Sequence, residues 1–181
     1  NFFDFVQYAN SKKIFCSTST NGHFLNDKNC VKTIESGLKR LIISIDGNSQ
    51  ETYEMYRKKG KYERVIEGTK NIIKWKKELN SQYPHVIFQF LVVKTNEHLI
   101  EEMKTLAADL GVDELRLKTA QFYNFENGNE LIPDNYFLTY LLHIYFIGWR
   151  LKKSIRRKWK ILRFVVVCES HYTIHVTTCF T

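Results

Sequence analysis

Short apolar runs alternate along the chain with longer stretches in which apolar residues recur every three or four positions. The short runs are rich in β-branched and aromatic residues and are bounded by turn-forming residues, which predicts strands. The predicted strands are residues 14–20, 40–46, 85–93 and 112–120. The predicted helices are residues 2–9, 27–37, 49–56, 61–80 and 97–111. Strands separated by helices indicate parallel β-α units in one α/β domain.

The C-terminal tail, residues 134–181, breaks this alternation. Its apolar, aromatic run at 136–149 has 14 residues, which is shorter than the roughly 20 that span a membrane. A basic stretch that fits an amphipathic helix follows at 150–163, and residues 164–181 predict one or two strands. We therefore expect an irregular tail without a transmembrane span.

The net charge of +8 belongs to the tail rather than to the body of the protein. Residues 1–134 carry 19 Lys and Arg against 18 Asp and Glu, whereas residues 135–168 carry eight basic residues and no acid. The basic composition therefore does not indicate a nucleic-acid-binding body, and we expect no nucleic-acid partner.

The four cysteines, Cys16, Cys30, Cys168 and Cys179, show neither a C-x-x-C pair nor the spacing of a zinc finger. Reduced thiols are the simplest interpretation, and no secretory signal is visible, so we expect a cytoplasmic protein. The chain starts at Asn1 next to an apolar run, which favours a fragment of a longer protein.

The predicted strand at 40–46 ends in polar residues. Ser44 and Asp46 are two positions apart, so they point to the same face, and Gly47 permits a tight exit. Ligands of parallel α/β sheets bind at the carboxyl ends of the strands, so this pair marks a candidate site. The alternative is that both residues cap the next helix or fix the turn.

Four stretches carry a family resemblance: "STSTNGHFL" (17–25), "SGLKRLIISIDGNSQETYEMYR" (36–57), "FQFLVVKTNEH" (88–98) and "LGVDELRLKTAQ" (110–121). Over residues 1–133 the chain resembles the radical SAM superfamily, and more closely its members with a SPASM-type C-terminal extension. The resemblance implies an incomplete parallel (β/α)6 barrel over this range. It makes residues 134–181 a degenerate or frame-shifted start of a SPASM-like extension, which need not be well ordered.

Members of this superfamily bind S-adenosylmethionine and a [4Fe-4S] cluster, and they abstract hydrogen from a substrate through a 5′-deoxyadenosyl radical. The resemblance implies a parent enzyme that modifies a peptide or small molecule and takes electrons from a reductant protein. The cluster motif C-x-x-x-C-x-x-C and the G-G-E segment of the family do not occur in these residues. The family places both ahead of Asn1, so we expect the chain by itself to be inactive.

The resemblance also assigns a cofactor pocket. Ser44 corresponds to a strand residue that hydrogen-bonds the cofactor ribose, with Asp46 beside it. Thr20 and Asn21 correspond to a strand tip that lines the pocket, and Arg57 to an arginine that reaches the cofactor or supports the pocket. Considered alone, the Asn-Gly pair is a turn signal and Arg57 begins a solvent-facing run.

Three further residues complete the expected pocket. Gln89 and Leu91 share a strand face and are expected to line the cavity, and Lys118 ends the last strand, where it is expected to meet an anionic group. The simpler roles are a hydrogen bond from Gln89 to a buried backbone group and a Lys118 side chain that snorkels from the rim.

Two functions from other classes remain open. One is a cluster-free β/α lyase or isomerase that uses Lys118 as amine or base. The other is a non-catalytic β/α module whose basic tail binds an anionic membrane, or nucleic acid with Trp149 and Trp159 stacking on bases.

Overall fold

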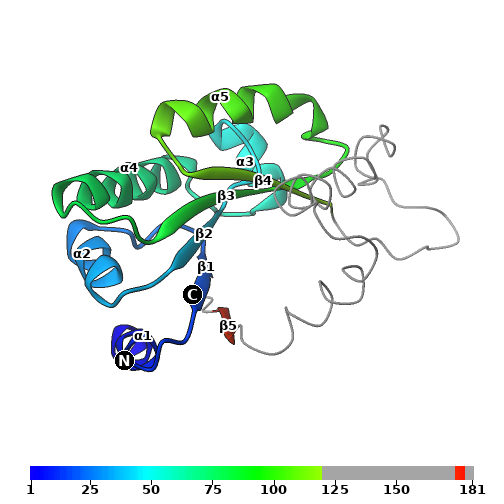
Figure 1. Ribbon diagram of the computed structural model, residues 1–181. Coiled ribbons are helices and arrows are strands. Elements are labelled where there is room, and N and C mark those ends of the chain that lie inside the picture. The colour runs from blue at the N-terminus through cyan, green and yellow to red at the C-terminus, as the bar shows by residue number, and fades with distance from the viewer. Residues whose placement is uncertain (120–173, 178–181) are drawn as a thin grey trace, which may run out of the picture.

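The computed structural model describes residues 1–119 and 174–177, which form an α/β fold with a parallel sheet (Figure 1). The strands are β1 (Cys16–Thr20), β2 (Arg40–Ser44), β3 (His85–Val92), β4 (Glu114–Thr119) and β5 (Ile174–Thr177). The helices are α1 (Phe2–Ser11), α2 (Asp27–Glu35), α3 (Gln50–Tyr56), α4 (Tyr62–Glu78) and α5 (Ile100–Leu110), with a 3-10 turn, η1 (Glu97–Leu99), before α5. The predicted order of strands and helices is confirmed up to β4.

The sheet has the strand order β4-β3-β2-β1-β5, and every neighbouring pair is parallel. Strands β1 to β4 follow one another in chain order, with helices in each connection. Strand β5 lies within the range predicted to hold one or two strands, and it pairs with the other edge of β1. The rest of the tail lies outside the described residues. The α/β class and the parallel sheet are confirmed, and closure into a (β/α)6 barrel stays a prediction.

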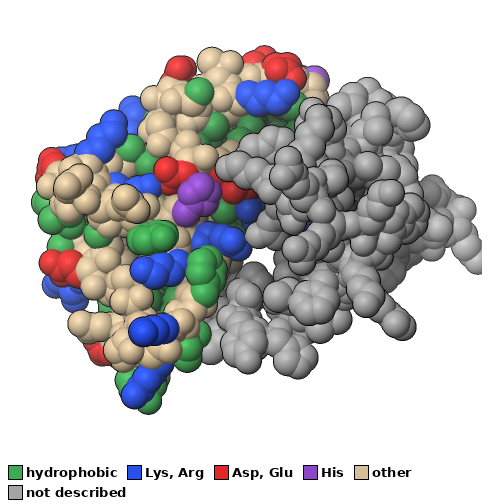
Figure 2. Space-filling model, in the orientation of Figure 1, with side chains coloured by type: hydrophobic (Ala, Val, Ile, Leu, Met, Phe, Trp, Pro, Cys, Tyr) green, Lys and Arg blue, Asp and Glu red, His purple; other side chains and the backbone are tan. Residues whose placement is uncertain are grey.

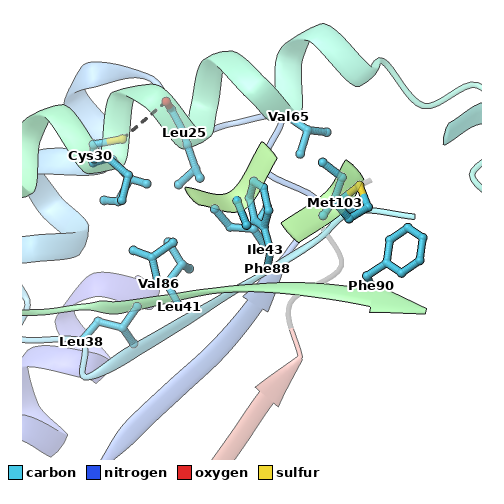
Figure 3. Close-up of a cluster of buried hydrophobic side chains, with 14 of the residues drawn as sticks. Leu25, Cys30, Leu38, Leu41, Ile43, Val65, Val86, Phe88, Phe90 and Met103 are labelled. Atoms are coloured by element: carbon cyan, nitrogen blue, oxygen red, sulfur yellow. Dashed lines mark hydrogen bonds between the residues drawn. The ribbon is translucent and has the colours of Figure 1, made fainter. Parts of the chain in front are cut away.

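One face of the sheet, which we call the helix face, packs against α2, α4 and α5. Alternate residues of β2 and β3 point to it, and Ile43 and Phe88 are completely buried there. They belong to one buried cluster with Cys30 of α2, Val65 of α4 and Met103 of α5, and Figure 3 shows Val65 and Met103 on the same side of the sheet as Ile43 and Phe88. Burying a side chain of this size contributes roughly 1.5–3 kcal/mol, so each of these residues adds substantially to the stability of the domain.

The turn after β2 differs from the expectation. The strand ends at Ser44, and α3 is capped by Ser49, whose hydroxyl accepts a hydrogen bond from the Thr52 main-chain N–H (3.2 Å). A Cβ atom on Gly47 would lie only 2.4 Å from the Tyr53 main-chain nitrogen, so the close approach of the chain to α3 requires glycine. The alternative in which Ser44 or Asp46 caps the helix is therefore wrong.

Candidate functional site

The candidate site lies at the carboxyl ends of β2 and β3, on the face of the sheet opposite the helix face. Ser44 is in register with Gln89, and Gln89 with Arg116, so the three side chains point to one face, which we call the site face. Ser44 and Gln89 are partly exposed, and neither side chain has a hydrogen-bond partner in the described part of the chain. The structure thus brings together a hydroxyl and an amide that are both open to a ligand. Within the described residues the Gln89 amide bonds to no buried backbone group, and its simpler role stays a prediction.

Asp46 follows this pair, but its carboxylate is already occupied by protein groups. The side chain is only 1 % exposed, and it accepts hydrogen bonds from Arg57 Nε (2.5 Å) and from the Leu91 main-chain N–H (2.9 Å). Asp46 therefore ties the end of β2 to β3 and to the end of α3. This agrees with the alternative in which Asp46 fixes the turn, and the solvent-facing interpretation of Arg57 is wrong.

Asn96 completes this network, and the sequence analysis did not single it out. Its side-chain amide donates to the main-chain oxygens of Asp46 (3.2 Å) and Leu91 (2.9 Å), and its Oδ1 accepts from the Val93 N–H (2.8 Å). The side chain is buried. An asparagine shortly after a predicted strand is a signal for such a turn, but only the fold shows that it also holds the neighbouring strand end.

Thr20 and Asn21 do not lie with Ser44 and Gln89 on the site face. Thr20 is in register with Ile43 and so points to the helix face, where it lines a cavity of about 320 Å³ beside α1 and α2. Asn21 Oδ1 accepts a hydrogen bond from the His23 N–H (3.2 Å), and the intervening glycine is left-handed (φ +78°). The turn role of the Asn-Gly pair is therefore confirmed.

Leu91 and Lys118 form the next register pair toward the carboxyl edge of the site face. Leu91 is partly exposed and Lys118 is exposed, so Lys118 lacks the buried setting that activates a Schiff-base lysine. Arg116, two residues earlier, was missed, although its alternation with Lys118 signals a shared face. Its guanidinium pairs with Glu114 (Nη2 to Oε1, 2.8 Å), so part of its charge is balanced within β4.

His23, in the turn after β1, is placed where its neutral form is favoured. Burial lowers its pKa, and the positive charges of Arg64 and Arg57 lower it further, whereas the main-chain carbonyl of Lys61 acts in the opposite direction. The Nε2 atom is buried and has no hydrogen-bond partner in the part of the chain that the structure describes. This setting could not be predicted from the sequence, because Arg57 and Arg64 come from segments distant from His23.

The described cysteines are packing residues, as the sequence indicated. Cys16 and Cys30 are buried, and burial raises the pKa of both thiols, that of Cys30 to about 12. Within residues 1–119 and 174–177 no group of three or more His, Cys, Asp or Glu side chains could hold a metal ion. These residues therefore do not fit an iron–sulfur cluster, whose ligands are thiolates. The same residues include no helix long and apolar enough to cross a membrane.

The fold is similar to that of a solved radical SAM-type protein, SuiB of Streptococcus suis, with a TM-score of 0.58 at 10 % sequence identity. The match covers 98 % of this chain and 36 % of the SuiB chain, so the chain spans about a third of that protein. No protein-family model matches the chain, and the search of curated proteins found no match. At this identity the likeness extends to the fold alone.

Proposed function

We propose that the chain is part of a radical SAM enzyme and that its site face binds S-adenosylmethionine. The observation that carries the proposal is the register pair Ser44 and Gln89 at the carboxyl ends of adjacent parallel strands, two polar side chains that have no hydrogen-bond partner among residues 1–119 and 174–177. Ligands of parallel α/β folds bind at this edge. The SuiB-like fold supports the same assignment.

The residues at the site face have different roles in the proposed binding. The Ser44 hydroxyl and the Gln89 amide supply the donors and acceptors that ribose hydroxyls require. Leu91 offers an apolar surface for the adenine ring. Asp46 and Asn96 hold the strand ends in place rather than contacting the ligand, because their polar atoms are bonded to the protein.

In the parent enzyme the bound cofactor would supply the radical that abstracts hydrogen from a peptide or small molecule. The described residues offer no cluster site, so the cluster ligands of the parent would come from other residues. Long-read sequencing of the source DNA tests this. An in-frame upstream C-x-x-x-C-x-x-C would support the parent enzyme, and a stop codon directly ahead of Asn1 would contradict it.

Cofactor binding by the chain itself is tested with S-adenosylhomocysteine, which keeps the nucleoside but cannot form a radical. Titration into the 15N-labelled chain should shift the Gln89 side-chain amide and the Ser44 N–H in NMR spectra, even where binding is weak. The Ser44→Ala/Gln89→Ala double variant should abolish these shifts at neighbouring amides. Thr33→Ala, which removes a hydroxyl of α2 on the opposite side of the sheet, is the matched control. Equal responses from both variants, or no response on the site face, would overturn the proposal.

A further inference from the structure

The amino-terminal edge of the sheet, opposite the candidate site, pairs cations with aromatic rings. Lys39 Nζ lies 4.2 Å from the centroid of the Tyr83 ring, and Arg40 Cζ lies 5.1 Å from that of Phe15. Main-chain hydrogen bonds link the starts of the three strands here, from the Lys39 N–H to the Cys16 oxygen (3.1 Å) and between Lys39 and β3. Cation–π pairs of this kind hold the charged group close to an apolar surface.

The end of α1 extends this surface. Lys12 Nζ lies 5.6 Å from the centroid of the Tyr8 ring, and Lys13 follows in an exposed, left-handed turn (φ 59°). Figure 2 shows basic and hydrophobic side chains interleaved around α1 and the lower left of the sheet. We call the set the amino-edge patch: Tyr8, Lys12, Lys13, Phe15, Lys39, Arg40 and Tyr83.

The three lysines of the amino-edge patch, Lys12, Lys13 and Lys39, have no acidic residue within three positions of them in the chain. Residues 5–26, 36–45 and 79–96, which contain the whole patch, include no Asp or Glu. The acids at the start of β4 are engaged elsewhere, Asp113 with Lys76 (2.6 Å) and Glu114 with Arg116 (2.8 Å). Within the described residues, Lys12, Lys13 and Lys39 form no ion pair.

The aromatic rings of the patch remain accessible. Tyr8 is 65 % exposed, Tyr83 44 % and Phe15 40 %. Exposed apolar surface next to uncompensated positive charge is complementary to a ligand that combines carboxylates with apolar side chains. A nucleic-acid strand fits less well, because four cations give few phosphate contacts and the paired cations cover one side of the rings.

We propose that the amino-edge patch binds an acidic peptide segment that carries apolar side chains. The carboxylates pair with Lys12, Lys13 and Lys39, and the apolar side chains pack on Phe15 and Tyr83. This surface lies at the opposite edge of the sheet from Ser44 and Gln89, so the inference does not depend on the proposed radical chemistry.

Fluorescence anisotropy tests the proposal with a labelled peptide of three Glu-Phe-Glu-Ser repeats, at low salt and with the full chain. Reversing two patch charges, Lys12→Glu with Lys39→Glu, should weaken binding by about tenfold or more, because like charges then face each other. The matched control, Lys28→Glu with Lys70→Glu, changes two exposed lysines of α2 and α4 and should alter the affinity by less than about twofold.

The basic tail is identical in both double variants, so its contribution to binding cancels in the comparison. Equal affinities for the two variants would place binding in the tail and overturn the proposal. So would the absence of peptide binding at low salt, or tighter binding of a thymidine oligonucleotide of the same length. If circular dichroism shows that the patch variant has not folded, Lys12→Ala with Lys13→Ala on the exposed end of α1 serves as the test. This variant should also bind the peptide more weakly than the control variant.

Discussion

The two faces of β2 and β3 differ although their residues alternate along the same strands. On the helix face, Ile43 and Phe88 are completely buried in the main apolar cluster. On the site face, Ile87 is also buried, but Ser44 and Gln89, which follow toward the carboxyl ends of the strands, are polar and partly exposed. Toward the carboxyl ends of β2 and β3 the helix face thus stays apolar, while polar side chains are found on the site face. Residues there can serve a ligand with little effect on the packing that stabilises the domain.

The sharpest test of this difference compares two adjacent residues. Phe88→Ala removes a completely buried ring from the helix face and should lower the free energy of unfolding by about 3–5 kcal/mol. Gln89→Ala, on the other face, should lower it by less than about 0.5 kcal/mol. Urea unfolding followed by circular dichroism measures both. Similar losses for the two variants would show that the faces do not differ as described.

The next largest effect concerns the link between the two strand ends. Asp46→Ala leaves the Arg57 guanidinium and the Leu91 N–H without their acceptor and should cost about 3 kcal/mol. A double-mutant cycle with Arg57→Ala isolates the pair, because the double variant should lose less than the sum of the single variants. Strict additivity would mean that the carboxylate and the guanidinium do not stabilise each other.

Replacing Asn96 should lower the free energy of unfolding by a smaller amount, again because buried polar groups lose their hydrogen-bond partners. Asn96→Ala removes a buried amide and leaves the main-chain groups of Asp46, Leu91 and Val93 unpaired, which should cost about 2 kcal/mol. Asn29→Ala is the matched control, since its amide makes one exposed contact with the Phe24 oxygen (2.8 Å). Thermal unfolding of the two variants should rank Asn96→Ala as clearly less stable. The reverse order would contradict a holding role for Asn96.

The smallest effect is a pH dependence of stability that originates at His23. Its pKa is lowered in the folded state from an ordinary value of 6.5, so the unfolded chain binds the proton more readily. The stability that neutral His23 provides is therefore complete above pH 6.5 and is lost as the pH falls through that value toward the folded pKa. In the His23→Asn variant, the unfolding midpoint should change less between pH 5 and 8 than it does in the wild type. Exposed His98→Asn is the control, and a flattening as large as that of His23→Asn would refute the assignment.

Much of the fold could be predicted from local pattern. The four strands up to β4 and the helices between them lie where apolar periodicity placed them, with differences of a few residues at their ends. Alternation within each strand places Ser44 with Asp46 and Gln89 with Leu91. Only the register between strands brings Ser44 and Gln89 to one face of the sheet and turns Thr20 to the other.

The sequence by itself determined the α/β class, the parallel order of the strands and the positions of the polar strand ends, because these follow from residue periodicity and turn chemistry. Only the tertiary structure decided which polar groups are free to bind a ligand. Asp46 was engaged by Arg57 and Leu91, and Thr20 was turned to the helix face, through contacts between segments far apart in the chain. Local sequence patterns do not encode such contacts, because they depend on how the strands and helices pack.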